Sequence, residues 1–102
     1  MNFDTAIKLF KDVILKQKEI YGENDTNTLM TMNDFANCYR DNNQLQKSID
    51  LQEQCLEKRK LVLSKHHPDT LTSMYNLAIC YKNNNQLQKA IDLQEQCLEI
   101  KN

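Results

Sequence analysis

The sequence predicts an all-α protein in which antiparallel helix pairs stack side by side into a superhelical array. The chain repeats itself: residues 27–60 align with residues 69–102 without gaps, and 21 of the 34 paired positions are identical. Apolar residues inside each copy recur at spacings of three and four, which is typical of a helix with one buried face. A single glycine, a single proline and the lack of β-branched runs argue against a sheet. Such a helix pair cannot bury its apolar face alone, so neighbouring pairs must stack.

We expect five helices, over residues 3–21, 27–41, 44–63, 69–83 and 86–101. The first helix of each full copy carries an apolar stripe, formed by Leu29, Met32, Phe35, Ala36 and Tyr39 and then by Leu71, Met74, Leu77, Ala78 and Tyr81. The second helix carries another, formed by Leu45, Ser48, Ile49, Cys55 and Leu56 and then by Leu87, Ala90, Ile91, Cys97 and Leu98. Residues 3–21 fit the second-helix pattern more loosely. The chain therefore divides into a half repeat (1–26), a full repeat (27–68) and a truncated repeat (69–102) of one domain.

The connections carry turn and cap signals. The two helices of a pair are separated by 41–43 (Asp-Asn-Asn) or 83–85 (Asn-Asn-Asn). A tight helix–helix turn often needs one left-handed residue, and asparagine is the best substitute for glycine there. Pro68 suits the first position of a helix, Asp69 suits the positive end of its dipole, and Asp25 can cap the preceding copy.

The charge balance excludes several classes of protein. Thirteen Lys and Arg residues stand against 14 Asp and Glu residues, a formal net charge of −1. This balance lacks the basic footprint of a protein dedicated to nucleic acid or to a membrane surface. No apolar run approaches the roughly 20 residues of a membrane span, and the first residues do not resemble a signal peptide. We therefore expect a soluble, cytoplasmic protein.

The residues that bear reactive groups favour structural roles. Cys38, Cys55, Cys80 and Cys97 occupy two repeat positions twice and form no Cys-x-x-Cys pair, so we expect four buried thiols, no metal and no disulfide. The adjacent histidines at 66–67 lack other ligands nearby and suit a turn or a cap. No glycine loop, nucleophile motif or catalytic constellation is present. We expect no enzymatic activity and no cofactor.

The first helix leaves two interpretations open. Lys8, Lys11, Lys16 and Lys18 lie beside Phe3, Ile7, Phe10 and Ile14. A basic amphipathic helix of this kind can bind membranes or calmodulin. Asp4, Asp12 and Glu19 dilute the charge, however, and the alignment with the second helix of each repeat favours a stacking helix.

The pattern Met74-x-x-Leu77-Ala78-x-x-Tyr81, followed by Ala90 and Cys97, resembles the tetratricopeptide repeat. The 42-residue period and the tract HPDTLTSMYNLAICY resemble the longer form found in kinesin light chains. The resemblance implies a right-handed superhelix whose first helices line a concave peptide-binding groove. The chain departs from the family pattern at Gln52 and Gln94, where the family often has an aromatic residue. It also departs at Asn43 and Asn85, where the family has glycine.

The groove that the resemblance implies would be lined by the stripe beside the core on each first helix. The two copies differ at all six paired positions of this stripe, whereas the second helices are nearly identical. The residues that we expect to bind a peptide in this groove are Asn33, Asp34, Asn37, Arg40, Tyr75, Asn76, Ile79, Lys82 and Asn83. Asn76 is the foremost candidate, because the family often places there an asparagine that bonds the backbone of a bound peptide; Asp34 is its counterpart. Arg40 and Lys82 could pair with acidic side chains.

Two functions remain open. The first is a non-catalytic scaffold that binds a peptide or a protein partner in the groove. The alternative is a structural or oligomerisation segment of a longer repeat array without a ligand of its own. Because the terminal helices lack polar caps, we expect either a fragment of a larger protein or a chain that associates end to end with copies of itself.

Overall fold

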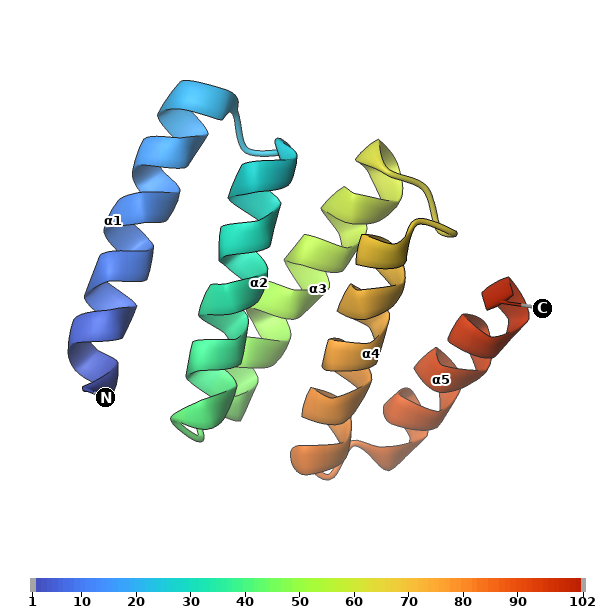
Figure 1. Ribbon diagram of the computed structural model, residues 1–102. Coiled ribbons are helices and arrows are strands. Elements are labelled where there is room, and N and C mark those ends of the chain that lie inside the picture. Colours follow the sequence, from blue (N-terminus) through green and yellow to red (C-terminus); the bar gives the residue numbers. More distant parts are fainter. Residues whose placement is uncertain (1, 102) are drawn as a thin grey trace.

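A computed structural model describes residues 2–101 of the chain, and the side chains of residues 2–99. Within this part the chain forms five helices and no strand (Figure 1). The helices are α1 (Phe3–Tyr21), α2 (Thr26–Asp41), α3 (Leu45–Val62), α4 (Pro68–Asn83) and α5 (Leu87–Lys101). The expected all-α class is confirmed, and each helix boundary lies within one residue of its predicted place.

The helices stack in chain order. Each one runs antiparallel to the one before it (Figure 1), and the extensive contacts join α1 to α2, α2 to α3, α3 to α4 and α4 to α5. The molecule measures 37 × 29 × 17 Å along its principal axes. A helix with its side chains is about 10 Å wide, so the shortest dimension accommodates two layers of helices.

The apolar stripes form two core clusters, one where α1, α2 and α3 meet and one where α3, α4 and α5 meet. The first cluster contains Ile14, Leu29, Met32, Phe35, Tyr39 and Cys55, and the second contains Ile49, Leu56, Met74, Leu77, Ala78, Cys80, Tyr81, Ala90 and Leu93. Phe35 stacks on Phe10 of α1 with ring centroids 5.4 Å apart and on Tyr39 at 4.5 Å. The predicted stripes of α2 and α4 are buried, apart from the half-buried Leu71.

A small residue lets α2 and α3 approach closely, as the alanine within the stripe predicts. Ala36 is fully buried, and the Ser48 hydroxyl donates a hydrogen bond of 2.7 Å to the Ala36 carbonyl. A larger side chain in place of Ala36 would separate the two backbones.

The turn and cap predictions are confirmed. Asn43 and Asn85 have φ angles of 59° and 61°, in the left-handed region that asparagine tolerates. The amide after each of them bonds back to the carbonyl of Tyr39 or Tyr81, at 2.8 and 2.7 Å, as in a Schellman motif. Asp25 caps α2 by accepting from the Asn27 amide at 2.8 Å.

The side chain of His67 caps the N-terminus of α4. Nδ1 of His67 accepts from the amide of Asp69 at 3.0 Å, and Pro68 occupies the first turn. The predicted turn or capping role of this histidine is therefore confirmed.

The stripe predicted for α5 is wrong in part. Leu87, Ile91 and Leu98 are 53%, 47% and 60% exposed, whereas Ile49 and Leu56, the equivalents of the last two on α3, are 2% and 5% exposed. The reason is that α4 packs on α3, whereas no described helix follows α5. Among the described side chains of α5, up to residue 99, the buried ones are Ala90 and Leu93, on the flank that faces α4.

Candidate functional site

The nine predicted binding residues lie on α2 and α4, and none of them is buried. Asn33, Asn37, Arg40, Asn76 and Ile79 are half-buried, whereas Asp34, Tyr75, Lys82 and Asn83 are exposed. The spacing of the core stripe explains this placement, because these residues flank the stripe that each helix buries. We call the surface formed by Asn33, Asn37 and Asn76 the amide face.

A direct hydrogen bond joins the two helices at the amide face. Nδ2 of Asn76 donates to Oδ1 of Asn33 over 3.2 Å. One amide can make up to four hydrogen bonds, two as donor and two as acceptor. The bond therefore fixes the two side chains relative to each other and leaves most of their hydrogen-bonding capacity unused.

A third helix, α3, also contacts the amide face. Gln52 of α3 is fully buried, and its Nε2 donates to Oδ1 of Asn37 at 3.4 Å. Its Oε1 is buried without a hydrogen-bond partner. The sequence places Gln52 in the core, in the position of an aromatic residue, but it does not reveal this contact. The only sign of this contact in the sequence is a polar amide side chain at a position that the repeat predicts to be in the core.

The other predicted residues are not drawn into the same network. Nε of Arg40 lies 3.6 Å from Oδ1 of Asp41, its neighbour on α2. Tyr75 lines a different cavity, of about 270 Å³, with Gln94, Cys97 and Leu98 at the outer side of α4 and α5. The structure thus joins Asn33 to Asn76 and leaves Tyr75 on a separate surface.

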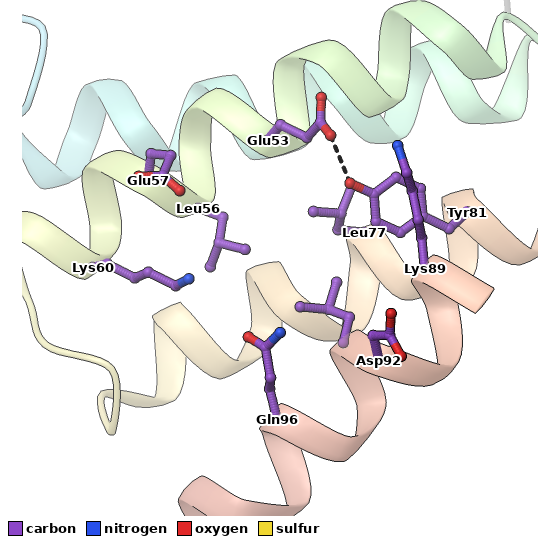
Figure 2. Close-up of a pocket in the computed structure, with 10 residues that line it drawn as sticks. Glu53, Leu56, Glu57, Lys60, Leu77, Tyr81, Lys89, Asp92 and Gln96 are labelled. Atoms are coloured by element: carbon purple, nitrogen blue, oxygen red, sulfur yellow. Dashed lines mark hydrogen bonds between the residues drawn. The ribbon is translucent and has the colours of Figure 1, made fainter. Parts of the chain in front are cut away.

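The largest of the described cavities lies elsewhere, between α3, α4 and α5 (Figure 2). Its volume is about 520 Å³, and it contains none of the predicted binding residues. Leu56, Leu77 and Leu93 provide its apolar surface, and its charged side chains are Glu53, Glu57, Lys60, Lys89 and Asp92. We call it the acidic groove, because three carboxylates face two ammonium groups. Sequence reasoning missed this groove, since each charged residue on its own looks like ordinary helix surface.

A tyrosine closes one end of the acidic groove. The Tyr81 hydroxyl donates to Oε2 of Glu53 over 2.6 Å, as the dashed line in Figure 2 shows, and Lys89 Nζ lies 5.6 Å from the ring centroid. Burial, together with the hydrogen bond to Glu53 and the charge of Glu53, raises the pKa of Tyr81 above its usual range. The phenol stays protonated and acts as a structural donor.

The remaining reactive groups form no recognisable centre. Among residues 2–99 no three His, Cys, Asp or Glu side chains gather closely enough to hold a metal ion. Cys38, Cys55 and Cys80 are buried as predicted, Cys97 is half-buried, and all four are free. Burial raises the pKa of the Cys55 thiol, so this thiol is held in its less reactive, protonated form. None of the five helices, within the described residues, is long and apolar enough to cross a membrane.

Comparison with known proteins agrees with this architecture. A family model described as tetratricopeptide repeat matches residues 1–60 and again residues 36–102. A crystal structure of nearly identical TPR-like repeats assigned to a kinesin light chain of Podosopora anserina is similar, with a TM-score of 0.87 and 30% identity. A variant of those repeats with one glutamine replaced by methionine matches with a TM-score of 0.88, also at 30% identity.

The match spans nearly all of this chain but only part of the solved ones. It covers 96% of this chain and 46% of each solved chain, so this chain spans about half of their length. No curated protein matches the sequence. The two family matches together extend over the whole sequence. The chain belongs to the tetratricopeptide repeat family.

Proposed function

We propose that this chain is a non-catalytic scaffold that binds a peptide segment of a partner protein across the amide face of α2 and α4. Tetratricopeptide repeats generally serve protein–protein interaction. The observation that carries the proposal is the hydrogen bond of 3.2 Å between Asn76 and Asn33. It joins the two helices of the face and holds two amides side by side at the surface.

The chemistry of the face suits an extended peptide backbone. Such a backbone carries unpaired N–H and C=O groups, and a primary amide can donate to one and accept from the other. Asn33, Asn37 and Asn76 are half-buried, so little side-chain freedom is lost when they bind. Lys82 and Asp34 are exposed on the same two helices with opposite charges. They would orient the bound segment through its own charged side chains.

A displayed peptide library provides the test, because the partner is unidentified. The chain should select peptides that bind saturably, and Asn76→Ala and Lys82→Glu should weaken the selected peptides without changing helix content. Asn24→Ala and Lys8→Glu are matched controls, since both residues are exposed and lie outside α2 and α4. Failure to select any peptide, or equal effects of the test and control substitutions, would refute the proposal.

The second candidate function is a structural or oligomerisation segment. It is favoured by Leu98, which is 60% exposed although its counterpart Leu56 is 5% exposed. An apolar helix face of this kind marks an interaction site on a soluble protein. Under this hypothesis the library yields no peptide, and the function depends on what covers α5.

A further inference from the structure

A second groove, with a chemistry unlike that of the acidic groove, opens between α1 and α3. Its volume is about 340 Å³. Buried or half-buried apolar side chains form its floor, and these are Ile14, Met32, Phe35 and Leu51. Its rim consists of exposed side chains, and these are Lys11, Leu15, Lys18 and Gln54. We call it the basic groove.

The two grooves are related by the 42-residue repeat, so they have the same construction. Ile14, Phe35 and Leu51 on the floor correspond to Leu56, Leu77 and Leu93 in the acidic groove. The rims differ at two positions, because Lys11 corresponds to Glu53 and Leu15 corresponds to Glu57. The other two rim positions are identical, since Lys18 corresponds to Lys60 and Gln54 to Gln96. One site in the fold is therefore present twice, and in the acidic groove two carboxylates replace a lysine and a leucine of the basic groove.

The two lysines of the basic groove are unpaired. Among the described side chains the ion pairs are Arg40 with Asp41 and Lys58 with Glu23, so Lys11 and Lys18 have no carboxylate partner. These two residues are seven positions apart on α1, which places them about 10 Å apart on one side of the helix. Leu15, 62% exposed, lies between them. The rim presents positive, apolar and positive groups in succession.

The outer face of α5 carries the complementary pattern. Ile91 and Leu98 are exposed and seven positions apart, and Glu95 and Glu99 are exposed beside them. Ala90 and Leu93, on the opposite side of α5, are buried against α4. Leu98, at the edge of the outer face, also lines the cavity of about 270 Å³ beside Tyr75. The face therefore presents an apolar stripe next to an acidic one.

We propose that the chain associates head to tail: the outer face of α5 (Ile91, Glu95, Leu98 and Glu99) docks in the basic groove of a second copy. The apolar pair would cover Leu15 and the floor of the groove, and the two carboxylates would lie beside Lys11 and Lys18. The acidic groove is the less favourable place for α5, because Glu53 and Glu57 would repel Glu95 and Glu99. Its two lysines, Lys60 and Lys89, are outnumbered by three carboxylates. This contact includes no residue of the amide face. The proposed self-association can therefore be tested separately from the proposed peptide binding.

The contact is heterologous, and this has a measurable consequence. Each copy offers one basic groove and one outer face of α5, so association can continue beyond a dimer into open chains. The charged half of the contact is exposed at its rim and therefore weakens as salt screens it. Association should rise with protein concentration and fall with ionic strength.

Sedimentation velocity from micromolar to millimolar concentration tests the proposal, together with two charge-reversed variants. Lys11→Glu with Lys18→Glu changes only the groove, and Glu95→Lys with Glu99→Lys changes only α5. Each variant alone should remain monomeric, because its two docking surfaces now have like charge. Mixing the two variants should restore association, since the intact α5 of the first fits the intact groove of the second.

The matched control is Lys8→Glu with Lys16→Glu, which makes the same charge change on α1 outside the groove. It should associate like the unmodified chain, and circular dichroism should show equal helix content in all variants. A chain that stays monomeric at every concentration would overturn the proposal, as would association that the charge reversals leave unchanged. A mixture that fails to associate would also overturn it. Because no peptide takes part, none of these outcomes bears on the amide face.

Discussion

The side chains of Asn33 and Asn76 meet across two helices that are not neighbours in sequence. Nδ2 of Asn76 lies 3.2 Å from Oδ1 of Asn33, although α3 separates α2 from α4 along the chain. The extensive packing contacts of the molecule join consecutive helices only. This hydrogen bond therefore joins α2 and α4, the first helices of the two repeats, directly. It lies on the surface that we propose to bind a peptide.

A double-mutant cycle should measure the coupling energy between Asn33 and Asn76. Because the pair is half-buried, we expect the hydrogen bond to contribute about 0.5–1.5 kcal/mol to the free energy of unfolding. Asn33→Ala and Asn76→Ala should each destabilise the chain, and their effects should be less than additive when combined. Urea unfolding of the single and double variants gives the coupling energy. Strict additivity would show that the two amides do not interact in solution.

Replacing Gln52 by leucine should stabilise the protein. The Oε1 of Gln52 is buried without a partner, and its Nε2 makes only a long hydrogen bond of 3.4 Å to Asn37. An unsatisfied buried polar group costs about 1–3 kcal/mol, so an apolar side chain of similar length should raise the free energy of unfolding by about 1 kcal/mol. Gln94→Leu is the matched control, because Gln94 occupies the same repeat position on α5 and is exposed. Equal effects of the two substitutions would contradict this explanation.

These residues also show what the sequence could and could not predict. The core positions of α2 and α4 follow from a spacing of three and four residues, because helix geometry alone decides which side chains share a face. The asparagine turns follow from local backbone sterics at Asn43 and Asn85. Both kinds of information are local to a short segment, which is why the fold and the helix limits were predicted well.

The contacts between helices could not be predicted in the same way. The bond between Gln52 and Asn37 depends on how far α3 is rotated against α2, and the exposure of Leu98 depends on which helix lies beside α5. The repeat even misled the prediction for Leu98, because its counterpart Leu56 is buried. Identical residues in two copies imply identical neighbours only when the neighbouring helices are present in both.

Arg59 should be the most important polar residue for holding α3 to α4. Its side chain is 5% exposed, and its Nη1 donates to the Asp69 carbonyl at 3.0 Å and to the Ser73 hydroxyl at 2.8 Å. Hydrogen bonds from a charged donor contribute about 1.5–3 kcal/mol, so Arg59→Ala should lower the free energy of unfolding by about that amount. Lys58→Ala should cost less than about 1 kcal/mol, because Lys58 pairs with the exposed Glu23 at the surface. Chemical unfolding of the two variants makes the comparison, and a larger loss for Lys58→Ala would refute it.

Alkaline pH should destabilise the fold through Tyr81. Its pKa is raised by burial and by Glu53, so the folded state retains the phenolic proton longer than the unfolded chain does. The sign follows from proton linkage: this contribution to stability is complete below the ordinary tyrosine value of 10.0, and it declines as the pH rises above that value. Tyr81→Phe should therefore flatten the decline in the urea midpoint above pH 10. Some decline should remain, because burial also raises the pKa of Tyr39. Tyr21→Phe, at a residue that is 53% exposed, should leave the profile unchanged.

The left-handed turns offer a route to a more stable chain. Asn43 and Asn85 have φ angles of 59° and 61°, which cost an ordinary L-residue roughly 1–2 kcal/mol and cost glycine nothing. Asn43→Gly should therefore raise the free energy of unfolding by up to about 1 kcal/mol, whereas Asn43→Ala should lower it by about 1 kcal/mol. Asn42, one residue earlier, has a φ of −86°, so glycine there should destabilise or have little effect. Thermal unfolding of the three variants provides the measurement. If Asn43→Gly and Asn42→Gly shifted the melting temperature by the same amount, the left-handed backbone at Asn43 would not be the cause.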